Sequence, residues 1–461
     1  SRMNYIQRKL ASILGLRLNQ QMVTAQKIGN GVVTWSGQNK LDQVKSGYMG
    51  NDIVYSVVNL ITDKAKVPDW YEYKIKDKKA YAKYKSLIAQ PDKITDWGEV
   101  LRWQSKSMEI VDKPSKISDL LKYPNENDTW SDLVELLVAY KLITGDSYTY
   151  GKLIEAGANN GLPNSLHALP SQYMSIIANV QAVPTEVVGY QLQVNTVTTF
   201  NREEIMHDKF ANLDYDGVGS QLYGQSPLHA GAKLLTKSNS QKQYEVSILQ
   251  NGGHFGVISI KGGNDMNYEE LLTQADLLRK HLRSVKGPEK GGSISITPAD
   301  IGFTPISMSA KDMEINQAYW NDVRAFCNIY GVPSQLLNDP DNKSYNSLIE
   351  AEKALTVRAT IPHLNSLRNN FNRKIYSDWG GIKDRIIDYD LNCFPELQKN
   401  KKELVDWISR APISIERTYE LLGEPVPDWM DEETRRTILV PQNLVALGEA
   451  PIDPSNDMYG K

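Results

Sequence analysis

The sequence predicts an α+β protein in which helices predominate. Three observations predict this class. Residues 310–375 have the pattern of two long amphipathic helices joined by a polar loop, residues 147–200 alternate like short strands, and residues 254–308 have the pattern of strand, helix and strand. The chain has 461 residues, 41% of them hydrophobic and 23% charged, which is typical of two or three soluble domains.

A mixed α/β part is expected at the front of the chain, after a polar N-terminal arm. Asp52 to Ala65 has apolar residues on one helical face, and Asn51 or Asp52 is a suitable cap. A strand-like run begins at Trp70. A second amphipathic helix is predicted from Thr129 to Leu142, capped by Asp128 or Thr129. Short strands are expected around Tyr148, Ser175 and Tyr190.

A long helix is predicted from Pro227 to about Gln250, with Ser226 as its cap and Pro in the first turn. Its middle, Lys237 to Lys242, is polar on every face. Such a helix is poorly held on its own, so we expect it to pack against other copies of itself.

A compact unit follows between His254 and Met308. It is expected to contain a strand at 254–260, a helix at 267–286 with a buried stripe that includes Ala275 and Leu278, and a second strand at 293–296. The unit is too small for a large core, so we expect it to share strands with a neighbouring subunit.

The second helical stretch runs from Ala310 to Tyr330 and ends at Gly331-Val332-Pro333, because Gly accepts a left-handed cap and Pro cannot continue a helix. The next loop, 338–344, has no apolar residue to bury. A long helix then continues to Ile375, with a kink predicted at Pro362. A strand at 385–389 is expected to return to the front part, and helices follow from 395 onward before a C-terminal end of disordered composition at 451–461.

The charge and cysteine content restrict the function. A net charge of −3 argues against a protein that grips DNA phosphates along a broad surface, although it is compatible with a conduit through which DNA slides. Cys327 and Cys393 are the only cysteines, so a reducing compartment is expected. No apolar run approaches the roughly 20 residues of a membrane span.

No catalytic, metal or cofactor site is predicted. The Gly-rich stretches at 261–263 and 287–292 lack the Gly-Lys-Ser/Thr ending of a phosphate loop. Asp214 and Asp216 could serve metal-assisted hydrolysis with His207, but they have no third carboxylate partner, so a plain loop and a strand-end histidine are favoured.

A lysine-rich run interleaved with Tyr81 and Tyr84 is the most basic stretch. Its members are Lys74, Lys76, Lys78, Lys79, Lys83 and Lys85. The run favours a solvated face, with binding of phosphate backbones as the alternative. Further along, Asp431-Glu432-Glu433 before Arg435-Arg436 indicates the first turn of a helix and its i+4 partners.

Several ordered motifs resemble the portal proteins of tailed bacteriophages of the siphophage type. Asn328 to Leu337 is similar to the family's aromatic-Gly-Val-Pro turn, with Ser334 in place of a second Pro, and Thr360-Ile361-Pro362 resembles its later Thr-x-x-Pro helix. Weaker matches occur in the family's order at Tyr123-Pro124-Asn125, Leu142 to Tyr148, Leu166 to Pro170, Ile205 to Asp208, Tyr223 to Leu228 and Leu249 to Gly253. Together they cover roughly residues 50 to 425.

The resemblance implies a ring, most often of twelve copies, and a division into named parts. Residues 1–226 would be the N-terminal arm and wing, 227–251 and 311–331 the two stem helices, and 252–310 the clip. Residues 332–346 would form the tunnel loop, 347–395 a kinked helix and the return to the wing, and 396–461 the crown helices and C-terminal tail.

The implied function is a head–tail connector at one capsid vertex. Double-stranded DNA would pass through it without sequence reading, driven in by the terminase large subunit and later ejected. The subunit would also dock tail adaptors and nucleate assembly with the major capsid protein or scaffold, in the host cytoplasm and then in the virion. It would need no cofactor and would not be an enzyme.

Two alternative functions remain open. The alternatives are a portal-like protein of a domesticated prophage or gene-transfer particle, and a metal-dependent DNA-processing enzyme.

The resemblance also implies which residues face DNA and which face the packaging motor. The DNA-facing tunnel loop would comprise Asn338, Asp339, Asn342, Lys343, Ser344 and Tyr345. The clip face toward motor and adaptors would comprise Lys286, Glu289 and Lys290.

Overall fold

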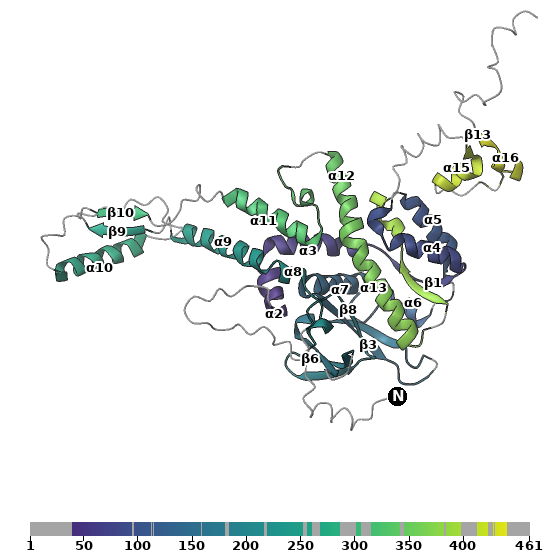
Figure 1. Cartoon of the computed structure of the whole chain (residues 1–461), viewed down its shortest axis with the longest axis horizontal. Helices are drawn as coiled ribbons and strands as arrows, with labels where there is room; N and C mark the ends of the chain where they lie inside the picture. Colours follow the sequence, from purple (N-terminus) through teal and green to yellow (C-terminus); the bar gives the residue numbers. More distant parts are fainter. Residues whose placement is uncertain are drawn as a thin grey trace, which may run out of the picture. The chain divides into compact units, whose positions relative to one another are not determined.

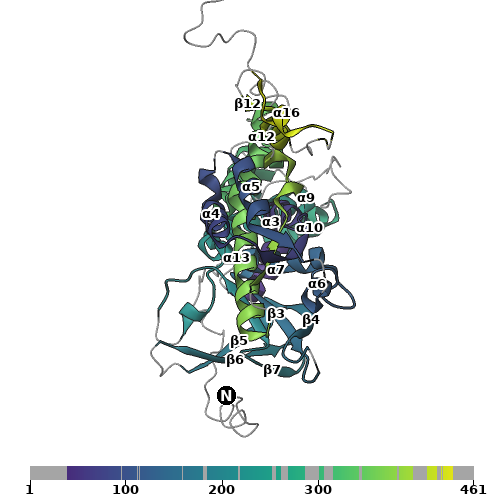
Figure 2. The same ribbon diagram turned by 90° about the vertical axis from the view of Figure 1, so that its right-hand side faces the viewer.

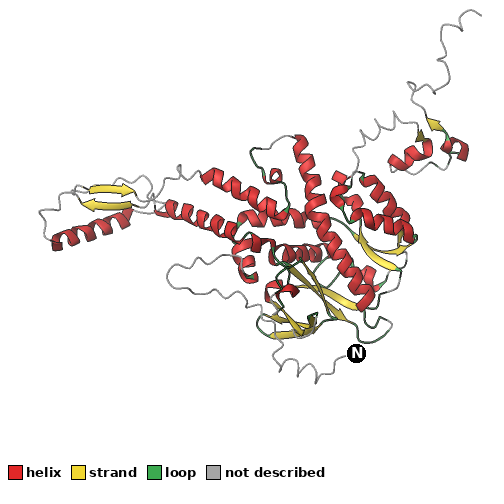
Figure 3. Ribbon diagram, in the orientation of Figure 1, coloured by secondary structure: helices red, strands yellow, loops and turns green. Residues whose placement is uncertain are grey.

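The computed structural model describes residues 39–439, apart from 95, 112, 114, 158, 180–183, 216–218, 252–255, 261–267, 286–300, 306–314, 342–344, 382–383, 398–412, 423–426 and 428. The chain forms two compact units, residues 1–74 with 110–390 and residues 75–109 with 391–461. The predicted α+β class is confirmed, since helices dominate and short strands complete the fold (Figures 1 and 3). None of the helices in the described part is both long and apolar enough to cross a membrane.

Two capped helices form the centre of the first unit. α3 (Asp52–Ala65) begins at Asn51, whose side-chain oxygen accepts two backbone N–H groups of the first turn. α7 (Trp130–Thr144) begins at a capping box formed by Thr129 and Asp132. Each helix starts at one of the two caps predicted for it, and their buried faces pack on each other. Shorter helices of this unit are α2 (Lys40–Asp42), a π-helical turn (Gln43–Tyr48) and α6 (Lys116–Leu120).

Two three-stranded antiparallel sheets follow α7, and they have the orders β4–β3–β8 and β5–β6–β7. Buried side chains, chiefly Tyr148, Met174, Ile176, Tyr190 and Ile205, form one core cluster between them. The strands expected around Tyr148, Ser175 and Tyr190 are therefore confirmed. The strand bounds are β3 (Asp146–Leu153), β4 (Pro163–Leu169), β5 (Met174–Asn179), β6 (Glu186–Gln193), β7 (Val197–Asn201) and β8 (Ile205–Lys209).

The helix expected from 227 to about 250 is divided in two. α8 (Pro227–Ala230) begins at Ser226, as predicted, and Gly231 separates it from α9 (Ala232–Asn251). A Cβ atom at Gly231 would lie 2.9 Å from Cδ1 of Ile329, so glycine allows the chain to pass close to the facing helix.

That facing helix is α11 (Ile315–Tyr330), which runs antiparallel to α9. Lys237 Nζ pairs with Asp322 Oδ1 at 2.5 Å, and Lys242 Nζ lies 5.4 Å from the ring centroid of Tyr319. Three residues back along α11 therefore correspond to five residues forward along α9. Along α11, Ala318 is half-buried, and Val323, Phe326 and Tyr330 are buried.

The polar middle of α9 finds its partners within this chain. The Asn51 amide donates to Ser238 Oγ at 3.1 Å and to Asn239 Oδ1 at 2.8 Å, and the Asn239 amide donates to the Ser46 carbonyl oxygen at 3.0 Å. Lys242 also pairs with Asp52. The turn before α3 thus supplies partners for this stretch within the chain, and its packing against other copies stays a prediction.

A π-helical turn interrupts the long helix after the loop. α12 (Tyr345–Ala354) continues through this turn (Leu355–Thr360) into α13 (Ile361–Arg373). Pro362 has no N–H for the carbonyl four residues earlier, and the N–H of Ile361 bonds instead to the Thr356 carbonyl, five residues back. The irregularity predicted at Pro362 thus takes the form of a wide turn just before it. A second π-helical turn spans Lys374–Asp378.

α13 lies against the β4–β3–β8 sheet, as both Figures 1 and 2 show. The predicted return strand is confirmed as β11 (Arg385–Tyr389). It pairs antiparallel with β1 (Trp70–Ile75), with Trp70 opposite Tyr389.

The segment between α9 and α11 contains β9 (Gly256–Ile260), α10 (Tyr268–Val285) and β10 (Ile301–Pro305). β9 pairs antiparallel with β10, and the predicted helix is confirmed as α10. The strand expected at 293–296 lies outside the described residues. In the expected buried stripe of α10, Ala275 is exposed and Leu278 is half-buried in the single chain. The prediction that Ala275 is buried within the chain is therefore wrong.

The second unit contains the lysine-rich run and the C-terminal elements. α4 (Lys78–Ile88) packs on α5 (Trp97–Ser107). The predicted helix start at Asp431 is confirmed, because Asp431 caps α16 (Glu432–Arg436) and Arg436 pairs with Glu432. The other elements are β2 (Met108–Ile110) at the unit boundary, β12 (Ile413–Ser414), α15 (Ile415–Leu422) and β13 (Ile438–Leu439). Residues 398–412 and 440–461 of the expected crown lie outside the described residues.

Candidate functional site

The polar loop after α11 starts with two residues in the left-handed backbone region. Gly331 has φ +71° at the end of α11, and Asn338 has φ +62° after a 3-10 turn (Ser334–Leu337). Asn is one of the few residues besides Gly that adopts this conformation readily, because its short polar side chain can bond locally. These two residues end α11 and the 3-10 turn that follows it.

An arginine of α11 holds the first half of this loop. Arg324 donates from Nε to Asp339 Oδ2 at 2.8 Å and from Nη2 to Asp339 Oδ1 at 2.7 Å, and it also pairs with Asp341. Ser334 Oγ donates to Asp339 Oδ2 at 2.8 Å, and the Asp341 N–H donates to Oδ1 at 3.2 Å. We call Arg324, Ser334, Asp339 and Asp341 the loop clasp.

Within the loop clasp, Arg324 and Asp339 form a bidentate guanidinium–carboxylate contact, which is stronger than a hydrogen bond between neutral groups. Asp339 has a side chain only 1% exposed, and that of Arg324 is 30% exposed. Hydrogen bonds from Arg324 lower the pKa of the Asp339 carboxyl well below its ordinary value of 3.8. The carboxylate is therefore ionised, paired and inward-facing at neutral pH.

The predicted tunnel-loop residues differ in their exposure to solvent. Asn338 is exposed, whereas Asp339 is buried within its own chain, so the structure does not agree with a DNA-facing role for Asp339. Asn342, Lys343 and Ser344 lie outside the described residues, as do the clip residues Lys286, Glu289 and Lys290. Tyr345 begins α12, and its side chain is not described.

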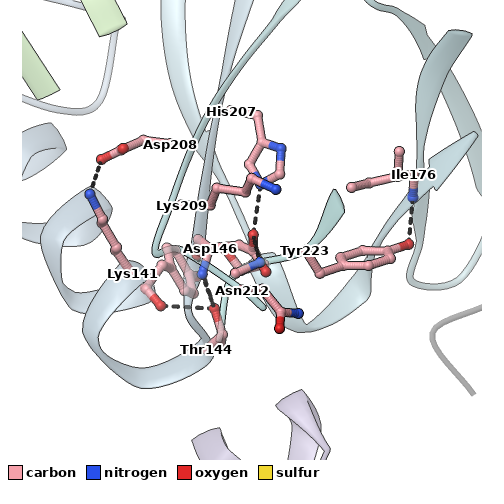
Figure 4. Close-up of polar contacts among 12 residues, drawn as sticks. Lys141, Thr144, Asp146, Ile176, His207, Asp208, Lys209, Asn212 and Tyr223 are labelled. Atoms are coloured by element: carbon pink, nitrogen blue, oxygen red, sulfur yellow. Dashed lines mark hydrogen bonds and ion pairs between the residues drawn. The ribbon is translucent and has the colours of Figure 1, made fainter. Parts of the chain in front are cut away.

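A second polar cluster is buried where β3 and β8 meet the N-terminal segment (Figure 4). Asp146, fully buried, binds His207 Nε2 at 2.7 Å through Oδ1 and Lys40 Nζ at 2.6 Å through Oδ2. The backbone N–H of Gly224 also donates to Oδ1, at 2.7 Å. Burial alone would raise the pKa of the Asp146 carboxyl, but Lys40 and His207 outweigh it and hold that pKa below its ordinary value.

The neighbouring residue of β8 links the sheet to two helices. Asp208 accepts from Lys141 Nζ of α7 at 2.8 Å, and from Ser366 Oγ and Asn370 Nδ2 of α13 at 2.7 Å each. Lys141 and Asp208 are 5% and 1% exposed. A buried pair satisfied on all sides in this way ties α7, β8 and α13 into one arrangement, because losing one partner would leave an uncompensated charge.

These contacts assign a structural role to His207. Its ring stacks on Tyr148 with centroids 4.4 Å apart and bonds to Asp146. Asp214 is exposed in the following loop, and Asp216 lies outside the described residues. No group of three or more His, Cys, Asp or Glu side chains in the described part of the chain is arranged to hold a metal ion.

Sequence reasoning missed Arg324, Lys141 and Asp146. Lys141 follows the buried residues Leu137 and Val138 on the same face of α7, and that placement was the available signal for it. Nothing in the local sequence indicates the partners of Arg324 and Lys141, which lie 15 and 67 residues away.

Comparison with known proteins agrees with this architecture. The sequence model of the phage portal protein family matches residues 99–411, more than half of the chain. An uncharacterised protein of Rickettsia bellii (strain RML369-C) is 25% identical over 346 residues, which is 71% of this chain and 81% of that protein. A probable portal protein of Streptomyces phage phiC31 is 23% identical over 261 residues, which is 55% of this chain and 53% of that protein.

Among solved structures, one from the neck of a native gene transfer agent particle, computed with C12 symmetry, has a similar fold. Its TM-score is 0.56 at 20% identity, with 88% of this chain and 99% of that chain covered. The family resemblance seen in the sequence motifs is thus confirmed, as is the portal fold. The chain belongs to the phage portal protein family.

Proposed function

We propose that this portal subunit forms a ring of twelve copies at one vertex of a virion or virion-like particle. Double-stranded DNA would pass through the ring, the terminase large subunit would dock on it during packaging, and tail adaptors would follow. Assembly with the major capsid protein or scaffold would take place in the host cytoplasm. The family match over residues 99–411 carries the proposal, and the C12 symmetry of the similar neck structure supports the ring.

The antiparallel pair α9 and α11 fits the proposed stem. It is a two-helix hairpin whose far end leads into β9, α10 and β10, the proposed clip. Exposed apolar side chains in the clip and on α12 support contacts between copies: Leu272 and Leu277 are 51% and 61% exposed, and Leu348 and Ile349 are 42% and 49% exposed. Residues 1–226 and 347–395 would form the wing, and 396–461 the crown.

The loop between α11 and α12 would be the tunnel loop. Asn338, Asn342, Lys343, Ser344 and Tyr345 are the proposed DNA-facing residues, since a lysine and neutral polar groups can touch phosphates without reading sequence. Asp339 would instead position the loop through Arg324, because its carboxylate is buried and paired. An inward aspartate also keeps a negative charge away from the DNA backbone.

The clip face toward motor and adaptors would include Lys286, Glu289 and Lys290. This assignment rests on their place in the chain, between α10 and β10. The family is one of structural proteins, so nucleotide hydrolysis would belong to the terminase and not to this subunit.

A portal-like protein of a gene-transfer particle is the second candidate, and the fold similarity to the neck structure is compatible with it. The fold and chemistry would be the same in both cases. A neighbouring terminase gene within a complete phage genome supports the phage portal, and a chromosomal cluster without replication genes supports the gene-transfer particle.

Electron microscopy of the purified chain in negative stain, with mass from light scattering on the same sample, tests the ring. We expect rings with an axial hole wide enough for duplex DNA and a mass about twelve times 51.9 kDa. Small oligomers without a hole, both alone and after coexpression with capsid protein and scaffold, would contradict the proposal.

A further inference from the structure

The exposed face of α4 in the second unit carries positive charge only. Lys78, Lys79, Lys83 and Lys85 are all exposed on this 11-residue helix, which contains no acidic residue. Residues 76–85 hold five lysines and one aspartate, a net charge of +4, in a chain of net −3. The rest of the chain is therefore −7, and the basic charge is local.

Few carboxylates neutralise this face. In the described part of the chain, no carboxylate lies within ion-pair distance of Lys79, Lys83 or Lys85. Lys76 does pair with Glu109 at 2.9 Å, where both side chains are roughly half exposed. Asp77 is engaged as the N-cap of α4, since its carboxylate accepts the backbone N–H groups of Lys79 and Ala80.

The opposite face of α4 fixes the lysines in place. Ala80, Tyr84 and Ile88 are buried at helical spacing, and the amide of Gln104 on α5 donates to Tyr84 OH at 3.4 Å. The backbone N–H groups of Lys76 and Asp77 both donate to the Ser107 carbonyl oxygen, at 2.9 and 3.2 Å. The basic face is therefore carried by a rigid two-helix support and not by a loose segment.

Like charges one turn apart destabilise a helix, so a run of this kind costs stability unless it has an anionic partner. Lys79 and Lys83 are one turn apart, about 5–6 Å between Cβ atoms. Lys78 and Lys85 lie two turns apart, about 10.5 Å. Duplex DNA presents a negative charge every ~1.7 Å of its axis, which suits several exposed ammonium groups at once.

We propose that the lysine face of α4 binds the phosphate backbone of double-stranded DNA that is not threaded through the ring. The choice of DNA among polyanions rests on the proposed portal function, because that function brings duplex DNA to the protein. The contacts are ammonium to phosphate and read no sequence. They are also distinct from those of the tunnel loop, which belongs to the other compact unit.

The test uses covalently closed circular duplex DNA, because a closed circle cannot thread a ring and so reports on the outer surface alone. Binding to the purified full chain is measured by filter retention between about 50 and 200 mM salt. The variant is Lys79→Glu with Lys83→Glu, and the control is Lys122→Glu with Lys152→Glu, two exposed lysines elsewhere with the same change in net charge. Circular dichroism confirms that each variant is folded.

We expect wild type and control to bind alike, and the α4 variant to bind at least about tenfold more weakly at the lowest salt. The slope of log K against log salt should fall by about 2, since each phosphate contact contributes roughly 0.9. Equal binding by the α4 variant, or an equal loss in the control, would overturn the proposal. So would tighter binding of wild type to vesicles of anionic lipid than to DNA. Ring formation is scored separately, so a failure of the portal proposal is recognised independently.

Discussion

Asp339 is the residue at which local sequence is the poorest guide to structure. It lies in a loop whose composition predicts solvent exposure, yet its carboxylate is buried against Arg324 and Ser334. A helix-surface pair would be three or four residues apart, whereas Arg324 precedes Asp339 by fifteen. The polar residues of the loop therefore have two roles. Asn338 is exposed to solvent, whereas Asp339 is buried and holds the loop against Arg324.

Replacing Asp339 with Asn should release the first half of the loop without unfolding the protein. The Asp341 N–H, which donates to Asp339, should exchange with solvent roughly tenfold faster or more, because hydrogen bonds to charged groups are the stronger ones. Hydrogen exchange with mass spectrometry measures this. Asp341→Asn is the matched control, since it removes the same charge from the same arginine but at a carboxylate 68% exposed, and its effect should be smaller.

The loop clasp also has a defined dependence on pH. Because the folded-state pKa of Asp339 is lowered below 3.8, its stabilisation is complete above that ordinary value and is lost only as the pH falls through the lowered one. Protection of the Asp341 amide in wild type should therefore persist at pH 4. Loss of protection between pH 6 and 5, or equal effects of the two variants, would contradict the assignment.

At the scale of elements, features set by neighbouring residues were predictable and long-range ones were not. Asn51 and Thr129 were each one of two caps predicted for their helices, because a cap acts on the next three residues. The break at Gly231 was missed, and the side chain that limits this position to glycine, Ile329, belongs to another helix. Likewise, the Asp208 site draws on Lys141 and Ser366, residues 67 and 158 positions away, which one sequence cannot bring together.

The end of α7 allows a test of such a long-range constraint. Gly145 has φ +85°, and a Cβ there would lie 2.5 Å from the Gly224 carbonyl oxygen. Gly331 also has positive φ, +71°, but a Cβ there would meet nothing within 4 Å. Gly331→Ala should therefore cost about 1–2 kcal/mol from backbone strain alone, and Gly145→Ala clearly more, because backbone atoms must move.

Urea unfolding of the two variants, followed by circular dichroism, measures the comparison. If Gly145→Ala destabilises the protein no more than Gly331→Ala, the close approach of α7 to the segment before α8 does not constrain the fold.

At the scale of the whole molecule, the order of short motifs along the chain predicted the portal family, and the comparison with the family model confirms this prediction. Motifs such as Ile329-Tyr330-Gly331-Val332-Pro333 encode a helix end and a turn, which is local information. The division into compact units was not predicted, because it pairs residues 75–109 with a segment that begins about 280 residues later, at 391. A single sequence contains no local signal for such a pairing.

That division predicts two separable unfolding transitions. Each unit has its own core, with Tyr84 fully buried in one and Leu137 fully buried in the other. Tyr84→Ala should lower the stability of peptides from 75–109 by about 3–5 kcal/mol and leave those from 130–210 almost unchanged, and Leu137→Ala should do the reverse, by about 2–5 kcal/mol. Hydrogen exchange in increasing urea resolves the two sets of peptides within one sample. Each variant serves as the control for the other, since both remove a fully buried side chain. If either one shifts both sets equally, the chain unfolds as a single cooperative body, and the lysine face of α4 is carried by the same folding unit as the stem helices.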